Sequence, residues 1–180
     1  MAVYAEAKHY ENKKRRFLKG LYKATDEGAD IVYIDETGFA PEAWRSHGRA
    51  NKGCRVHGEK PSGKRPRTSL IGGYRNSKLI APVAFEGTCN TAFFNAWMEQ
   101  HLLPELKAGS VIVLDNATFH KSRTTWELAK ARGCKLLFLP PYSPHLNPIE
   151  KLWANIKRAW SYASNLTIHQ FLASGIYIWD

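Results

Sequence analysis

The spacing of apolar residues along this chain changes between the period of a strand and the period of a helix. These changes predict the order of its secondary-structure elements. Buried strands are expected at the apolar runs 31–34, 111–115 and 135–140, and a hairpin at 68–74 and 78–85. Helices are expected over 3–25, 91–106, 121–132, 147–161 and 167–178. Thr91 and Ser122 are the expected caps of the second and third helices. A helix between two buried strands makes them a parallel pair with a right-handed crossover, so the pattern predicts one mixed α/β domain.

Two of the predicted strands lead into an aspartate. Asp35 follows the first run in IVYIDETGF, where Gly38 is expected to break the strand, and Asp115 ends the strand in VIVLDNATFH. Strand alternation places Asp35 and Glu36 on opposite faces, so a regular strand presents only one of them to a given site. If the strands are parallel neighbours, Asp35 and Asp115 lie side by side at the carboxyl edge, and like charges there need a cation. The alternative is that each aspartate only begins a turn.

A third acidic residue, Glu150, lies in the first turn of the predicted helix 147–161. It flanks the apolar stripe of that helix, and Lys157 lies two turns along on the same side. The stripe consists of Ile149, Leu152, Trp153, Ile156 and Trp160. Two interpretations of Glu150 stay open. With Asn147 as N-cap it completes a capping box, or it faces a metal ion and a phosphate beside the core.

The net charge of +10 is concentrated in one stretch of the chain. Between Trp44 and Lys78 there are ten basic residues and one acid, Glu59, so this segment carries +9. Its Gly and Pro content predicts a flexible arm or hairpin that contacts the phosphates of a nucleic acid; a solvated, lysine-rich loop is the alternative. The candidate DNA-binding residues are Arg45, Arg49, Lys52, Arg55, Lys60, Lys64, Arg65, Arg67 and Lys157.

Length and composition narrow the class of protein. The chain has 180 residues, of which 44% are hydrophobic, and this suits a globular domain with a full core. Neither a membrane-spanning apolar run nor a signal peptide is evident. The three cysteines, Cys54, Cys89 and Cys134, form no CxxC pair, which predicts a reducing, cytoplasmic location rather than a disulfide framework or a zinc site.

Three segments together resemble the catalytic domain of DDE transposases, the superfamily that contains the mariner elements and many bacterial insertion sequences. They are IDETGF at 34–39, LDNATFHKS at 114–122 and LPPYSPHLNPIEKLW at 139–153. The 34 residues between Asp115 and Glu150 are a spacing typical of that superfamily. The resemblance implies an RNase H-like fold, a mixed sheet of about five strands with helices on both faces. It implies a catalytic domain at 30–180 after a basic helical linker at 1–29.

The resemblance also implies a chemistry. It assigns a metal-binding catalytic triad to Asp35, Asp115 and Glu150, which would hold two Mg²⁺ or Mn²⁺ ions. Such a site hydrolyses a DNA phosphodiester and transfers the freed 3′-OH to target DNA, so transposon ends and target DNA are the expected partners. A homodimer and, in a bacterium, a nucleoid-associated location are further expectations. Asn116 and His120 match the family pattern as accessory residues, and His120 either orients substrate or caps the following helix.

One departure from the family pattern leaves alternatives open. Family members usually carry N-terminal helix-turn-helix modules, but only 34 residues precede Asp35 here. The chain is therefore expected to be a truncated copy, a fragment or one product of a split frame with a separate helix-turn-helix partner chain. A non-mobilising DNA-binding remnant is the alternative function. A stand-alone RNase H-like nuclease is a third hypothesis, which the segment SPHLNPIEKLW disfavours.

Overall fold

A mixed five-stranded sheet forms the centre of the computed structural model, which describes residues 2–39, 50–55, 68–163 and 166–175. The strand order is β3-β2-β1-β4-β5. β1 pairs antiparallel with β2, and β2 with β3, whereas β1, β4 and β5 are parallel. The strands are β1 (Ile31–Phe39), β2 (Thr68–Arg75), β3 (Lys78–Glu86), β4 (Val111–Leu114) and β5 (Lys135–Phe138). The predicted hairpin and the predicted parallel crossover are both confirmed.

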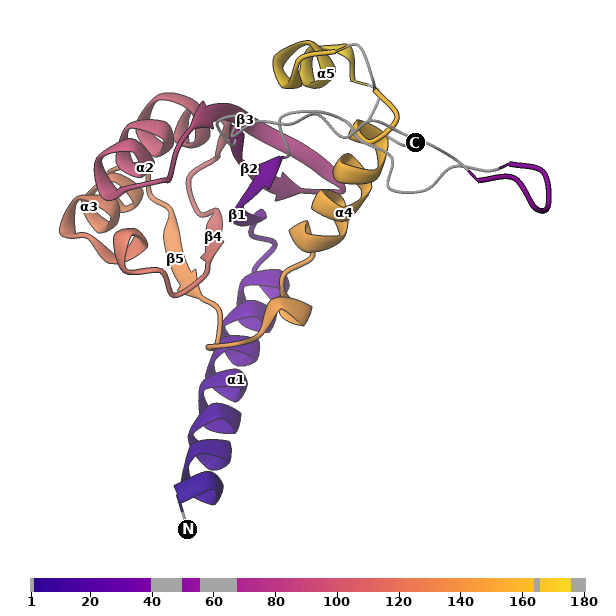
Figure 1. The fold of residues 1–180 in the computed structure, drawn as a ribbon. Coiled ribbons are helices and arrows are strands. Elements are labelled where there is room, and N and C mark those ends of the chain that lie inside the picture. The colour runs from indigo at the N-terminus through magenta and orange to yellow at the C-terminus, as the bar shows by residue number, and fades with distance from the viewer. Residues whose placement is uncertain (1, 40–49, 56–67, 164–165, 176–180) are drawn as a thin grey trace.

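Helices cover both faces of this sheet, as predicted (Figure 1). The core on one face joins Val32 and Ile34 to α2, η1 and α3; the core on the other joins Phe39 and Leu70 to α4 and α5. The helices are α1 (Ala2–Asp26), α2 (Thr91–Trp97), α3 (Arg123–Ala131), α4 (Ile149–Trp160) and α5 (Ile168–Ser174). Shorter helical turns are η1 (Met98–Leu102), η2 (Leu103–Glu105), η3 (Thr118–Lys121) and η4 (Pro144–Leu146).

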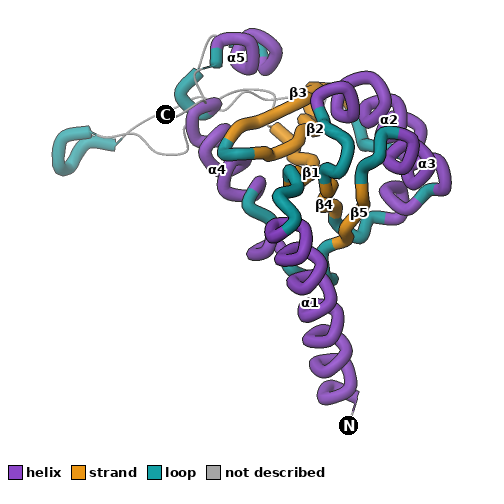
Figure 2. Tube along the Cα trace, turned by 180° about the vertical axis from the view of Figure 1, so that it is seen from behind, coloured by secondary structure: helices purple, strands orange, loops and turns teal. Residues whose placement is uncertain are grey.

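The basic helix α1 extends well beyond the sheet at its N-terminal end, as both views show (Figures 1 and 2). Its C-terminal part is anchored by apolar packing: Phe17 and Ala24 are buried there against Val113 and Leu139, in a small cluster below β4 and β5. Tyr10, nearer the N-terminus, is hydrogen-bonded to Ser143 Oγ at 3.0 Å. The helix matches the one expected over 3–25. Within the described residues, no helix is long and apolar enough to cross a membrane.

Strand β1 is longer than predicted. It continues through Gly38 to Phe39 instead of ending at Asp35, because β2 pairs with it along this whole length. Hydrogen bonds to β2 hold the backbone of Gly38 in the extended conformation. Pairing with a neighbouring strand therefore outweighs the low strand propensity of glycine. The parallel pairing with β4 stops earlier, at Tyr33 opposite Val113. Asp35 therefore lies in mid-strand, just where β1 loses its partner on one side.

Three helix boundaries also differ from expectation. Asn90, not Thr91, caps α2, by accepting a hydrogen bond from the backbone N–H of Phe93. The helix expected over 91–106 is α-helical only to Trp97 and then becomes π- and 3₁₀-helical, since Pro104 cannot donate an intrahelical hydrogen bond. The last helix ends at Gly175, which has a positive φ of 66°. Ser122 caps α3 as predicted.

A glycine in β2 shapes the sheet beside Asp35. Gly72 is the register partner of Asp35. A Cβ built on Gly72 would lie 2.8 Å from Leu79 Cδ1 and 3.4 Å from the Trp153 ring. The indole of α4 thus packs directly on the bare backbone of β2, one strand away from Asp35. A Cβ at position 72 would force Leu79 to shift and would touch the indole, so only side chains larger than that of alanine would push on Trp153 itself.

Candidate active site

The acidic residues Asp35, Asp115 and Glu150 line a single cleft of about 410 Å³. The register of the sheet explains the first two. Tyr33 is opposite Val113 in the parallel ladder; two residues later, Asp35 still lies within β1, whereas Asp115 lies just after the end of β4. Glu150 comes to the same cleft from the first turn of α4, which packs on β1 and β2. The other lining residues belong mainly to the segment after β5, from Leu139 to Asn147.

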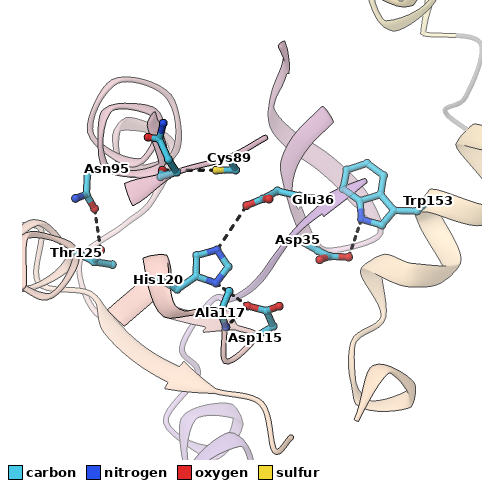
Figure 3. Close-up of polar contacts among 10 residues, drawn as sticks. Asp35, Glu36, Cys89, Asn95, Asp115, Ala117, His120, Thr125 and Trp153 are labelled. Atoms are coloured by element: carbon cyan, nitrogen blue, oxygen red, sulfur yellow. Dashed lines mark hydrogen bonds and ion pairs between the residues drawn. The ribbon is translucent and has the colours of Figure 1, made fainter. Parts of the chain in front are cut away.

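Asp35 is a largely buried carboxyl. Its Oδ2 accepts a hydrogen bond of 3.0 Å from Trp153 Nε1 (Figure 3). Burial raises the pKa of Asp35, the negative charges of Glu150 and Asp115 raise it further, and the donors Trp153 and the backbone N–H of Glu36 offset only part of this, so the pKa is about 7. The charges of Glu150 and Asp115 thus act on the Asp35 carboxylate across the cleft.

Asp115 has the opposite environment. Its Oδ1 accepts hydrogen bonds from the Ala117 backbone N–H at 2.9 Å and from His120 Nδ1 at 2.7 Å. Partial burial alone would raise the pKa of Asp115, but these two donors and the positive charges of His120 and Lys121 outweigh it, so the net shift is downward. About half of the side chain remains exposed. Asp115 is therefore ionised at neutral pH.

His120 lies behind Asp115 and is only 3% exposed. Its ring sits between Phe94 and Phe119, with centroid distances of 4.4 Å and 4.2 Å. Nε2 lies 3.6 Å from Glu36 Oε1, so the imidazole lies between two carboxylates (Figure 3). Burial lowers the pKa of His120, but Asp115 and Glu36 raise it by more. His120 does not cap the next helix, because the Ser122 side chain accepts from the Thr125 backbone N–H there.

Glu150 is exposed; its backbone N–H donates to Asn147 O at 3.2 Å, but its carboxylate makes no hydrogen bond or ion pair with any described residue. Of the two interpretations left open for Glu150, the capping box with Asn147 is not formed: α4 starts at Ile149, after Pro148, and no side chain caps it. Instead, Asn147 is buried and its Oδ1 has no hydrogen-bond partner within the described ranges. Capping therefore does not account for Glu150, and its carboxylate is free to act in the cleft.

Asn116 has a structural contact. Its Nδ2 donates to the backbone oxygen of Leu139 and so ties the loop after β4 to the segment after β5. That hydrogen bond connects two sides of the cleft that are distant in sequence. The side chain of Asn116 is thereby used in shaping the cleft wall.

Most of the candidate DNA-binding residues lie outside the described part of the chain: Arg45, Arg49, Lys60, Lys64, Arg65 and Arg67. Lys52 and Arg55 are described and exposed, on a short segment that stands away from the sheet (Figure 1). Lys157 is exposed on α4. The DNA-binding role of all these residues stays a prediction.

Sequence reasoning missed three contributors to the site. Trp153 was assigned to the apolar stripe without its hydrogen bond to Asp35. Glu36 was placed correctly on the opposite face of β1, but its approach to His120 depends on how η3 folds back, which no local pattern signals. Tyr142 lines the cleft with 97% exposure and a positive φ of 52°, unusual for a bulky residue. Only the proline-rich run around it hinted at an irregular backbone.

Asp35, Asp115 and Glu150 line one cleft, but their side chains do not form a compact set of metal ligands. Among residues 2–39, 50–55, 68–163 and 166–175, no three His, Cys, Asp or Glu side chains are close enough together to hold a metal ion as they stand.

Comparisons with known proteins indicate the same family as the sequence motifs. Residues 30–171 match the family described as DDE superfamily endonuclease. A stretch of 53 residues is 47% identical to the Tc3 transposase of Caenorhabditis elegans, covering 29% of this chain and 16% of that protein. The structure is similar to the Mos1 strand transfer complex, with a TM-score of 0.72 and 20% identity over 96% of this chain and 55% of that one.

The isolated catalytic domain of the Mos1 mariner transposase is also similar, with a TM-score of 0.63 and 16% identity, covering 96% of this chain and 83% of that domain. The chain thus spans about half the length of the larger Mos1 chains. The structural likeness supports the RNase H-like fold, and the family match covers all three acidic residues of the cleft. The chain belongs to the DDE superfamily endonucleases.

Proposed function

We propose that this chain is the catalytic domain of a DDE transposase, which cleaves DNA phosphodiesters and joins the freed 3′-OH to target DNA. The observation that carries the proposal is the convergence of Asp35, Asp115 and Glu150 on one cleft, inside a segment that belongs to an endonuclease family. Each acid comes from a different element, and neither a helix cap nor an ion pair accounts for Glu150.

The donor set of the cleft fits a divalent metal ion. It offers carboxylate oxygens, which hard ions such as Mg²⁺ and Mn²⁺ prefer, and three mutually repelling acids gain from a cation between them. Solved Mos1 paired-end complexes contain Mn or Mg. Asp35, Asp115 and Glu150 would hold two ions, which would supply an activated water and charge stabilisation for the leaving 3′-oxygen.

The protein's own side chains contribute position and charge. Trp153 holds one oxygen of Asp35, and His120 and the Ala117 N–H hold one oxygen of Asp115. Asp115 is ionised before any ion arrives, whereas Asp35 must give up a proton that its pKa of about 7 lets it retain near neutral pH. Asp115 can thus bind a cation without losing a proton, whereas Asp35 must first be deprotonated.

DNA is the proposed substrate. Mos1 transposase is known in complex with transposon-end DNA. The charge of +10 and the exposed Lys52, Arg55 and Lys157 fit a polyanionic partner. Recognition of specific transposon ends with the help of a separate helix-turn-helix partner chain, and a homodimer on DNA, belong to the same proposal. A location in the cytoplasm, at the nucleoid if the source is bacterial, follows from that substrate.

Plasmid cleavage tests the proposal. We expect the wild-type chain to nick supercoiled DNA with Mg²⁺ or Mn²⁺ and to be inactive with EDTA. Asp115→Asn and Glu150→Gln should each lower the rate by on the order of 10³-fold, since metal-borne charge stabilisation is worth several kcal/mol. The control Glu127→Gln changes an exposed acid paired with Arg123 on α3, and it should keep the wild-type rate.

The substrate specificity of the wild type separates the alternatives. DNA binding without metal-dependent cleavage would contradict the enzymatic proposal and favour a non-mobilising remnant. Preference for an RNA–DNA hybrid over duplex DNA would instead favour an RNase H-like nuclease. Joining of a labelled 3′-OH oligonucleotide to plasmid would support strand transfer itself.

A further inference from the structure

The cleft has a second layer behind it, formed by Glu36 and His120. These two residues lie on the opposite side of β1 from Asp35, yet they lead directly to Asp115 (Figure 3). Glu36 Oε1 faces His120 Nε2 at 3.6 Å, and His120 Nδ1 faces Asp115 Oδ1 at 2.7 Å. The imidazole therefore connects β1 to the end of β4 through side chains, at the point where the backbone ladder between these strands has stopped.

The first step concerns the two oxygens of Asp115. Oδ1 already accepts from His120 Nδ1 and from the Ala117 N–H, which leaves it little capacity for a further ligand. Oδ2 has no such partner among the described residues, and about half of the side chain is exposed. Holding Oδ1 on the protein side turns Oδ2 toward the cleft. His120 thus selects which oxygen of Asp115 is offered there.

The second step concerns what holds His120. Packing between Phe94 and Phe119 fixes the plane of the ring, and only 3% of the residue is exposed. Its Nε2 and Glu36 Oε1 are both buried, and neither has a hydrogen-bond partner in the described ranges. The two atoms lie 3.6 Å apart, at ion-pair distance, and the Cys89 thiol also lies close to the Glu36 carboxylate. A buried polar atom without a partner is costly, so a small approach of these two atoms satisfies both.

The third step concerns Glu36 itself. It follows Asp35 in the strand, so the pleat directs the two carboxylates to opposite faces. One strand segment thereby supplies a cleft acid on one face and the support of the neighbouring cleft acid on the other. A change in the position of β1 would move Asp35 directly and Asp115 through Glu36 and His120.

From these contacts we infer that Glu36 and His120 are positioning residues of the metal site, and that Glu36 holds the His120 ring so that His120 presents Asp115 Oδ2 to the divalent ion. The inference rests on the proposed function, because it assumes that Asp115 binds the ion. Residues that support metal-binding side chains in this way typically contribute 10–100-fold in metal affinity or activity, roughly the effect expected here.

Mn²⁺ titration of the metal-free chain, followed by calorimetry without DNA, is the direct test. We expect Glu36→Gln and His120→Asn each to weaken Mn²⁺ binding by roughly 10–100-fold. His120→Asn retains a donor near Asp115 but cannot reach Glu36. The double variant should be no weaker than His120→Asn alone, because both changes interrupt the same chain of contacts. The control Glu127→Gln should bind Mn²⁺ as the wild type does.

Two further measurements keep a folding effect apart from positioning. Circular dichroism and melting temperature of Glu36→Gln should stay close to wild type, and excess Mn²⁺ should restore its cleavage but not that of Asp115→Asn. If His120→Asn does not fold, ¹⁵N NMR of the wild-type imidazole decides the geometry, because a proton on Nδ1 bonded to Asp115 is required.

The outcomes distinguish this inference from the proposed function. Wild-type Mn²⁺ affinity and cleavage in both Glu36→Gln and His120→Asn would overturn the positioning role and leave the proposed function intact. Additive losses in the double variant would overturn the link through His120. Absence of Mn²⁺ binding by the wild-type chain would overturn the proposed function instead.

Discussion

Asp35 and Asp115 hold matching positions on neighbouring parallel strands, but their carboxylates have opposite acidities. Asp35 is partly buried, and its desolvation and the charges of Glu150 and Asp115 outweigh its one side-chain donor, Trp153, so its pKa is about 7. Asp115 is half exposed and has His120 and the Ala117 N–H as donors, so its pKa is lowered. The difference teaches that strand position brings the two acids together, whereas donors from other elements decide which one holds a proton.

The pH dependence of stability is the strongest test of this difference. The folded-state pKa of Asp35 is raised from 3.8 to about 7, so its contribution is fully present below pH 3.8 and is lost as the pH rises to about 7. For metal-free protein, the unfolding free energy of wild type minus that of Asp35→Asn should therefore fall by a few kcal/mol across this window. Urea denaturation at a series of pH values measures it.

Asp115 gives the opposite sign in the same experiment. Its folded-state pKa is lowered, so its contribution is present above pH 3.8 and is lost as the pH falls through the folded-state pKa. The difference between wild type and Asp115→Asn should thus shrink on acidification. Parallel curves for the two asparagine variants would contradict the distinction between the aspartates.

At a fixed pH of about 8 the two asparagine variants should move stability in opposite directions. Asp35→Asn removes a buried, repelled charge and should stabilise the metal-free chain. Asp115→Asn weakens the charge-assisted contact with His120 and should destabilise it by about 1 kcal/mol, a value reduced by the exposure of Asp115. Thermal melts in EDTA measure both, and destabilisation by both changes would show that Asp35 is better compensated than its neighbours indicate.

The smallest effect concerns the single side-chain donor to Asp35. Trp153→Phe removes the hydrogen bond from Nε1 and should lower the unfolding free energy more at pH 8 than at pH 5, by about 1 kcal/mol, because the ionised carboxylate loses more. Trp160→Phe is a matched control on the same helix. Its Nε1 is buried without a hydrogen-bond partner among the described residues, so its cost should not depend on pH. Equal pH dependence in both variants would contradict the contact.

Local sequence was sufficient for the parts of the site that depend on strand period. Alternation separated Asp35 from Glu36, and the matching apolar runs placed Asp115 beside Asp35, because both features follow from the pleat and from parallel pairing. The true length of β1 was not predictable in this way. Gly38 stays extended only because β2 pairs with it, and that partner lies about 30 residues away in sequence.

Side-chain contacts between elements were beyond local prediction for a similar reason. The helical stripe identified Trp153 as a core residue, but its reach to Asp35 depends on the position of α4 over the sheet. The His120 contacts depend on η3 turning back toward β1. Glu150 shows the converse: its sequence context suggested a cap, and the actual start of α4 at Ile149 removed that interpretation.

Gly72 has a consequence for mutational tolerance. It carries no reactive group, but it is the register partner of Asp35, and a Cβ there would meet Leu79 at 2.8 Å and the Trp153 ring at 3.4 Å. A larger residue would displace the indole that donates to Asp35. In a scan of all substitutions along β2, we would therefore expect position 72 to be as intolerant as a reactive residue, although it contacts no substrate.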